Sequence, residues 1–303
     1  MYDTICSFIQ TREKINKNFL NILNDSQDKI TSEETLKGEL GNLKVKQVYD
    51  GISIFGSLPK YYLGNNLKTL TRQGTERAIE KLSDELCINL KESKLYRLDV
   101  AGNFVMNEPY LNYLPYLGDC KHLKKSNWRG SAYYTNSKRQ LVFYDKPKEM
   151  KNKRAELPEE FKQYESRILR YELRFLKRIK DQFGKVVLLS DLYDEDFYIN
   201  ILNKWKDSYF EISKINSLNL NKMENATSKE FKDYLLSNLI QEKGLDHILD
   251  IVDSNRNKFK SSIEASRLKA ELKRIINNSN YSENNELILE LDEKVNQAVK
   301  YYR

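Results

Sequence analysis

The sequence contains little of several residue types that mark particular classes of protein. Among 303 residues there are 11 glycines, 5 prolines and 3 cysteines, too few for a collagen-like chain, a proline-rich linker protein or a disulfide scaffold. No stretch approaches the ~20 consecutive apolar residues of a membrane-spanning helix, and the first residues lack the basic lead and cleavage site of an export signal. We therefore expect a cytoplasmic protein that does not bind a membrane.

Histidine is nearly absent. The two histidines, His122 and His247, lie far apart in the chain, which argues against a two-histidine metal site or a Ser-His-Asp triad. The cysteines form no C-x-x-C pair, so they offer no zinc framework. Any catalysis must therefore depend on carboxylates, lysine, arginine or tyrosine, and the chain has 20 tyrosines.

Positive charge is concentrated in one segment. Residues 120–180 contain 18 Lys and Arg against 7 Asp and Glu, whereas the rest of the chain contains 33 against 37. Aromatic residues that can stack on unpaired bases are interleaved with this charge, among them Trp128, Tyr133 and Tyr134. The pattern indicates a polyanionic partner such as nucleic acid. A solvated face, with lysine stems lying over apolar atoms, has the same composition and stays an alternative.

The spacing of apolar residues predicts an α+β fold built on an antiparallel sheet with flanking helices. A helix is predicted from residue 75 to 86, a short helix over 107–114, a basic loop over 118–130, and a loop leading into a helix over 146–160. Another helix runs to Trp205 from a cap at Ser190 or Asp191. The strands are predicted at residues 1–9, 43–49, 52–55, 96–106, 131–135, 139–144 and 168–176.

The chain after residue 228 is predicted to be helical and highly charged. We place a domain boundary after residue 215, so that 1–215 form the α+β domain and 216–303 a helical C-terminal region for DNA binding or oligomerisation. A helix-turn-helix over 261–276 is one interpretation of its basic residues, and an amphipathic core helix is the other.

Two predicted strands repeat the same polar pattern, Arg97-x-Asp99 and Arg170-x-Glu172. Residues two apart lie on one face of a strand, so four charges converge if the strands pair. In one interpretation these are exposed ion pairs, worth ~0.2–1 kcal/mol each. In the other, Asp99 and Glu172 hold Mg²⁺ or Mn²⁺, which prefer oxygen ligands.

A third polar group closes the strand at 139–144, in the segment Y-D-K-P-K-E. A phenol with a pKa of about 10 is a poor nucleophile unless a cation stabilises its phenolate. Lys146, two residues after Tyr144, can face the same way. Glu149 can complete a carboxylate site for the metal ion.

Taken together, these segments resemble a known family. RLDVAGNF, SNWRGSAYYTNSKRQLVFYDKPKEM and LRYELRFLKRIKDQFG are similar to the replication initiator encoded by gene II of filamentous phages and, more distantly, to trans-acting rolling-circle initiators of plasmids. The resemblance covers roughly residues 1–215. It rests on an opening M-x-D, an R-[IL]-D strand, an N-W segment, Y-x-K-x-x-E and an R-[FY]-E strand, in that order.

The resemblance implies a rolling-circle initiator that nicks one strand of origin DNA. Tyr144 matches the family's nucleophile, Lys146 and Glu149 match the rest of its motif, and the acids of the flanking strands match Asp99 and Glu172 as metal ligands. Many relatives use a second tyrosine, for which Tyr133, Tyr134 and Tyr171 are candidates, with stacking or packing as the alternative. Residues expected to bind DNA or its phosphates are Arg97, Arg170, Arg174, Trp128, Arg129, Tyr133, Tyr134, Lys138 and Arg139.

The expected reaction leaves a 5′-phosphotyrosine and a free 3′-hydroxyl, and a later hydroxyl reverses the step to rejoin the strand. The expected partners are single-stranded or melted origin DNA, a host polymerase and helicase, and a second copy of the chain. Arg97, Arg170 and Arg174 can either orient the acids or grip the phosphate. The alternative function is a non-enzymatic protein that binds origin DNA or RNA.

Overall fold

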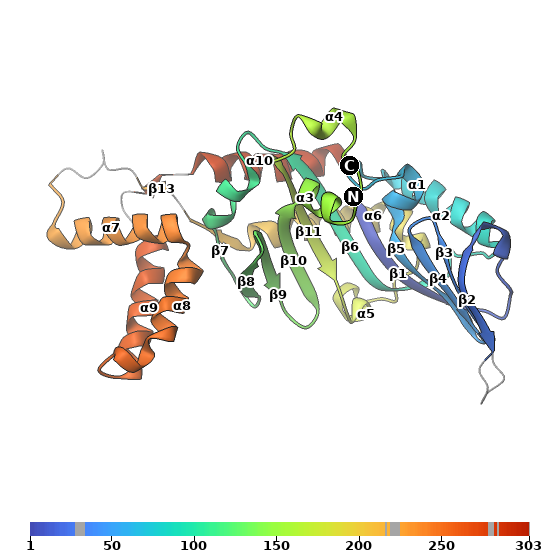
Figure 1. Ribbon diagram of the computed structural model, residues 1–303, viewed down its shortest axis with the longest axis horizontal. Coiled ribbons are helices and arrows are strands. Elements are labelled where there is room, and N and C mark those ends of the chain that lie inside the picture. The colour runs from blue at the N-terminus through green and yellow to red at the C-terminus, as the bar shows by residue number, and fades with distance from the viewer. Residues whose placement is uncertain (28–33, 216, 219–224, 278–281, 284, 303) are drawn as a thin grey trace.

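A ten-stranded antiparallel sheet forms the centre of the protein (Figure 1). The computed structural model describes residues 1–27, 34–215, 217–218, 225–277, 282–283 and 285–302. The strand order is β2-β3-β4-β5-β1-β6-β11-β10-β9-β8. The bounds are β1 (Tyr2–Gln10), β2 (Asn21–Gln27), β3 (Glu34–Leu40), β4 (Leu43–Val48), β5 (Gly51–Ser57), β6 (Lys94–Val105), β8 (Lys124–Trp128), β9 (Ser131–Thr135), β10 (Arg139–Asp145) and β11 (Ile168–Phe175).

Helices α6 and α10 pack on one side of the sheet, called here the covered face (Figure 1). Trp205 of α6 stacks on Tyr171 of β11 with ring centroids 5.0 Å apart, and Phe143 of β10 stacks on the other side of Tyr171 at 4.7 Å. The helices are α1 (Leu58–Leu63), α2 (Arg72–Leu86), α3 (Lys146–Asn152), α4 (Glu159–Lys162), α5 (Ile179–Phe183), α6 (Glu195–Phe210), α7 (Ser228–Lys243), α8 (Leu245–Ser254), α9 (Ser262–Asn277) and α10 (Glu286–Tyr302).

The opposite side of the sheet, called here the open face, carries the polar residues of the same strands. In β11, Leu169, Tyr171 and Leu173 join the core, while Arg170 and Glu172 alternate with them. This period of two is the one that the sequence predicts. The two predicted hairpins, β4–β5 and β9–β10, are confirmed, as is the predicted α+β class.

Four predictions of local structure are wrong in detail. The predicted loop at 118–130 contains β8 and also β7 (Leu117–Cys120), which pairs with β12 (Ile212–Lys214). The predicted helix at 107–114 is two 3₁₀ turns, Tyr110–Asn112 and Leu114–Tyr116, because Pro115 has no N–H to continue a helix. Asp194, one turn later than expected, caps α6 through its bond from the Phe197 amide.

The fourth correction concerns the chain directly after Tyr144. The segment 146–160 was expected to begin as a loop, but α3 begins at once, at Lys146. Asp145 caps this helix by accepting from the Lys148 amide at 3.0 Å, and Pro147 stands in the first turn, where proline fits a helix. Residue 146 is therefore helical and does not continue the alternation of β10.

The chain after residue 215 contributes to two cores. Helices α7, α8 and α9 pack together through Ile240, Leu249, Ala265 and Leu272 and project beyond the sheet in Figure 1. Helix α10 instead returns to the covered face, where Leu291 and other apolar residues join the main core. The predicted boundary after residue 215 stays a prediction. None of the helices described here is long and apolar enough to cross a bilayer.

Candidate active site

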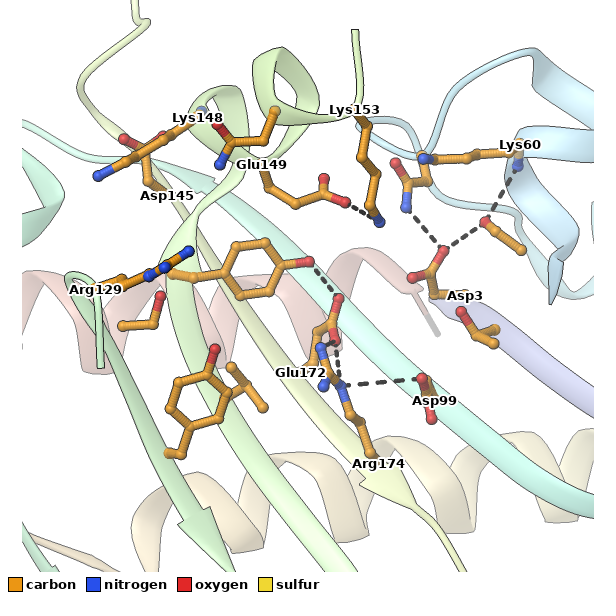
Figure 2. Close-up of a pocket in the computed structure, with 18 of the residues that line it drawn as sticks. Asp3, Lys60, Asp99, Arg129, Asp145, Lys148, Glu149, Lys153, Glu172 and Arg174 are labelled. Atoms are coloured by element: carbon orange, nitrogen blue, oxygen red, sulfur yellow. Dashed lines mark hydrogen bonds and ion pairs between the residues drawn. The ribbon is translucent and has the colours of Figure 1, made fainter. Parts of the chain in front are cut away.

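A pocket of about 1060 Å³ lies on the open face (Figure 2). Its floor includes Tyr144 of β10, Glu172 of β11, and Asp99 of β6. Helices α1 and α3 and the β8–β9 turn supply its walls, which carry the basic residues Lys60, Arg129, Lys148 and Lys153. Strand order explains the convergence, because β10, β11 and β6 are neighbours in the sheet although their sequences are far apart.

The hydroxyl of Tyr144 donates a hydrogen bond to Oε1 of Glu172 at 2.6 Å. The tyrosine side chain is half-buried, and burial raises its pKa well above the ordinary value of 10, against the opposing effect of the Arg170 guanidinium. The phenol is therefore protonated at neutral pH. The hydrogen bond to Glu172 on the next strand fixes the direction in which the Tyr144 hydroxyl points.

Glu172 is 2% exposed and is held by two arginines. It accepts from Nε of Arg170 at 2.6 Å and from Nε of Arg174 at 2.7 Å. Burial raises the pKa of this carboxyl, but the two guanidinium groups outweigh burial and hold the pKa well below its usual range. Glu172 is therefore an anion that orients the tyrosine.

Arg170 lies beneath the pocket and is 1% exposed. Its guanidinium contacts Oδ2 of Asp3 at 2.7 Å and Nε donates to Glu172, while Nη1 donates to Oδ1 of Asn103 at 3.0 Å and to the carbonyl of Asn66 at 2.9 Å. Asp3 is fixed in turn by the hydroxyl of Ser57 at 2.6 Å. The charged group of Arg170 is enclosed by protein, which favours the orienting one of the two roles that the sequence left open.

Asp99 forms a bidentate pair with Arg97 on the same strand, at 2.9 Å from Nε and 2.7 Å from Nη2. Nε of Arg174 lies 4.0 Å from Oδ2 of Asp99 and also donates to Glu172, so this arginine connects the two acids (Figure 2). Burial raises the pKa of Asp99 to about 6, although the hydrogen bonds from Arg97 act in the opposite direction.

Lys146 differs from its predicted placement. Its side chain is fully buried, and Nζ donates to Oε2 of Glu149 at 2.6 Å. Burial and Arg170 lower the pKa of Lys146 to about 8. Burial opposes the ionisation of Glu149, but Lys146 and Lys153 outweigh it and bring the pKa of Glu149 to about 2. The cation that acts on the Tyr144 phenol is therefore Arg170, and Lys146 instead supports Glu149 on the pocket wall.

The predicted metal ligands Asp99, Glu149 and Glu172 all line this pocket. Each of them is paired with cationic side chains, and in the described part of the chain no three His, Cys, Asp or Glu residues are grouped as metal ligands. In this arrangement the residues do not fit a divalent cation, because guanidinium and ammonium groups already face the carboxylate oxygens. Mg²⁺ or Mn²⁺ stays a prediction that this geometry does not support.

The expected DNA-contact residues fall into two groups. Trp128, Arg129 and Tyr133 line the pocket with Tyr144, as do Arg97 and Arg174. Trp128 is 61% exposed, and the Arg129 guanidinium lies 4.5 Å from the centre of its ring. This pair forms an exposed, cationic and aromatic rim.

The other expected contacts lie elsewhere. Tyr134 does not reach the pocket, because its side chain is fully buried and its hydroxyl donates to the carbonyl of Gly118 at 2.8 Å. Arg170, predicted as a phosphate contact, is likewise enclosed by protein. Arg139 pairs with Glu211 at 2.8 Å and lines a separate cavity with Lys138. Tyr171, a candidate second tyrosine, lies in the core on the covered face and stacks on Trp205, which is the packing position predicted from the sequence as the alternative.

The sequence did not single out several residues that the structure brings into the site. Asp3 contacts Arg170, and Lys60, Lys148 and Lys153 stand on the walls (Figure 2). A signal existed for Asp3, since it is the acid of the opening M-x-D, but no role was assigned to it. The three lysines gave no signal, since they belong to helical turns whose place beside the sheet depends on the whole topology.

Comparison with known proteins identifies the family. A family model that describes the N-terminal part of the gene II replication-associated protein matches residues 1–208. No curated protein matches the sequence. The family implies initiation of rolling-circle replication, in agreement with the resemblance in the sequence. Because the match covers more than half of the chain, the protein belongs to the family of replication-associated proteins encoded by gene II of filamentous phages.

Proposed function

We propose that the protein nicks one strand of its origin DNA with the hydroxyl of Tyr144 as the nucleophile, and later rejoins that strand. The observation that supports this most directly is the 2.6 Å hydrogen bond that directs the Tyr144 hydroxyl to Glu172 on the floor of an open, basic pocket. Family membership supports the DNA substrate.

The pocket supplies the charges that a phosphodiester requires. A DNA phosphate is an anion and repels a nucleophile, so positive groups around it lower the barrier. Arg129, Lys148 and Arg174 line the pocket, while Arg170 and Glu172 below set the position of the phenol. The exposed Trp128 ring offers a stacking surface for an unpaired base beside the cleaved phosphate.

The proposed step is a transesterification. The Tyr144 oxygen forms a bond to phosphorus as the bond from phosphorus to the 3′ oxygen breaks, which leaves a 5′-phosphotyrosine. Glu172 takes the phenolic proton and releases it to solvent water, and water supplies one proton to the leaving 3′ oxygen, so that one proton moves overall from the phenol to the 3′-hydroxyl. Because the pKa of Glu172 is low, its carboxylate is a weak base. The phenol of Tyr144 therefore gives up its proton only after the phosphate has approached it. A 3′-hydroxyl that returns to the phosphotyrosine reverses the step and restores the phosphodiester.

The test uses supercoiled plasmid that carries the origin of the replicon encoding this protein, with Mg²⁺ supplied. Open circles should form, and mass spectrometry should find the DNA 5′ end on Tyr144. Tyr144→Phe should bind the origin and lose nicking by a factor of ~10⁴ or more. Tyr171→Phe is the matched control, since it makes the same change on the covered face of the next strand, and it should nick.

Unchanged nicking by Tyr144→Phe, or a DNA adduct on another residue, would show that Tyr144 is not the nucleophile. Binding of the origin by the wild type without any nicking would favour the non-enzymatic alternative.

A further inference from the structure

Three exposed lysines occupy neighbouring positions on the open face of strands β3 and β4, outside the basic segment 120–180. They are Lys37, Lys44 and Lys46. Lys37 lies directly opposite Lys46 in the antiparallel register. Within the part of the chain that the structure describes, none of the three forms an ion pair. Like charges directly opposite each other destabilise a sheet, so this arrangement is unfavourable unless an anion binds there.

The lysines lie on the same face as the pocket and are connected to it through the strand register. Lys44 is opposite Phe55 of β5, Phe55 is opposite Cys6 of β1, and Cys6 is opposite Arg97 of β6. Both Phe55 and Arg97 line the pocket of Tyr144. The open face is therefore one continuous surface from the nucleophile to the lysines.

Two aromatic side chains of these strands are exposed, one in the pocket and one next to Arg97. Phe55 is 40% exposed, and the Arg97 guanidinium lies 5.8 Å from the centre of its ring. The register of β6 against β1 shifts between Arg97 and Leu95, and Tyr96, at this irregularity, is 53% exposed. Cations along a groove, with aromatic rings among them, are typical of surfaces that bind single-stranded nucleic acid.

The geometry allows a strand of DNA to reach both places. In the sheet order, β4 is five strands from β10, and a strand spacing of about 4.8 Å gives roughly 24 Å between them. This is the length of several nucleotides. Glu39 lies opposite Lys44 and lowers the net charge of the patch, but the other two lysines face no carboxylate in the register.

We propose that Lys37, Lys44 and Lys46, with Phe55, bind single-stranded DNA on one side of the phosphodiester that Tyr144 attacks. This inference rests on the proposed function for the identity of the strand. The lysines hold successive phosphates, and the Phe55 ring, opposite Lys44 and in the wall of the pocket, stacks on a base.

The test compares two triple variants of the full chain that lose the same charge. Lys37→Gln/Lys44→Gln/Lys46→Gln removes the patch, and Lys91→Gln/Lys206→Gln/Lys300→Gln removes three solvent-accessible lysines that lie outside both the patch and the basic segment 120–180. Fluorescence anisotropy with a labelled single-stranded oligothymidylate of about 30 nucleotides gives affinity over a range of salt concentrations. A duplex of the same length is the second probe.

The patch variant should bind the single strand more weakly than the control, and its log–log salt slope should be shallower by roughly 2, since each lost phosphate contact removes about 0.7. It should unfold at the same or a higher urea concentration than wild type, because the repulsion between Lys37 and Lys46 is gone. Phe55→Leu should also weaken single-strand binding several-fold.

Equal affinities and salt slopes for the two triple variants would overturn the proposal, as would a loss confined to the duplex probe. The assay measures binding alone, so these outcomes are independent of cleavage. Failure of the wild type to nick would overturn the proposed function and leave the binding result intact.

Discussion

The two faces of the central strands β6, β11 and β10 have opposite chemistry. On the covered face, the ring of Tyr171 stacks on Phe143 and on Trp205, with centroids 4.7 and 5.0 Å apart. On the open face, at neighbouring positions of the same strands, Tyr144 and Glu172 belong to a network of charged and hydrogen-bonded groups. Along each of these strands, residues that pack in the core therefore alternate with residues that belong to the candidate site.

The comparison indicates that the site is rigid for two reasons. Its backbone is held by aromatic packing on the reverse side of the strands, and its side chains are held by ion pairs among themselves. A buried charge that loses its partner is far more costly than a lost core hydrogen bond. The open face should therefore be the more sensitive of the two to single substitutions.

The largest effect is expected for Arg170→Met. This change leaves Asp3 without its buried cation and removes one partner of Glu172, and we expect the free energy of unfolding to fall by about 3–5 kcal/mol. Nicking should also be lost, because Glu172 no longer holds Tyr144 in place. Urea denaturation followed by circular dichroism measures the first effect and plasmid nicking the second.

The control for this substitution neutralises Asp3 and Glu172, the two acids that lose Arg170 as a partner. Asp3→Asn/Glu172→Gln on the Arg170→Met background should recover part of the lost stability, because no unpaired buried charge remains. Wild-type stability of Arg170→Met alone would contradict the view that the ion pairs hold the open face in place.

A smaller, pH-dependent effect is expected at Asp99. Burial raises its pKa from 3.8 to about 6, so between these values the folded protein holds a proton that the unfolded chain lacks. Stability due to this group must therefore fall as the pH rises through that window, by about 2–3 kcal/mol. Asp99→Asn should lack this dependence, so it should gain stability relative to wild type from pH 4 to about pH 7.5.

Urea titrations of both proteins at the two pH values measure this difference. Glu149 and Glu172 titrate in wild type and variant alike, so their contributions cancel. A stability difference that is the same at both pH values would show that Asp99 is ionised throughout and that its pairing with Arg97 outweighs burial.

The smallest effect is expected for Tyr171→Phe on the covered face. The Tyr171 hydroxyl donates to the backbone carbonyl of Trp205 at 3.0 Å, and loss of this bond should cost about 0.5–1.5 kcal/mol. The nicking rate of the folded protein should not change. The same tyrosine-to-phenylalanine change at Tyr144, one strand away on the opposite face, removes the proposed nucleophile. Equal losses of nicking in the two variants would remove the distinction between the faces.

Much of this arrangement could be predicted from the sequence, because alternation in a strand is a local property. The alternation of residues in the sequence predicted that Tyr144 lies in one strand, and that Arg170, Glu172 and Arg174 lie on one face of another. It could not give the order of the strands, which brings β1 beside β6 and so places Asp3 against Arg170. Pairing between distant strands depends on the whole fold.

The error at Lys146 has a local cause. The interpretation extended the two-residue period of the strand past Tyr144, but Asp145 caps a helix there, and the side chain two residues on turns into the protein. Tyr134 shows the converse. Its place among basic residues suggested a DNA contact, whereas the alternation of β9, in which Ala132 and Tyr134 are both buried, directs it to the core.

The return of helix α10 to the sheet has a consequence for synthesis of the protein. Domains generally fold as units during translation, N-terminal first. Here the core that supports the site also contains Ile288, Leu291, Val295 and Val299, which are synthesised long after the strands of the sheet. Until helix α10 emerges, the nascent sheet exposes an apolar surface, so the core behind the site cannot be completed before this helix is made.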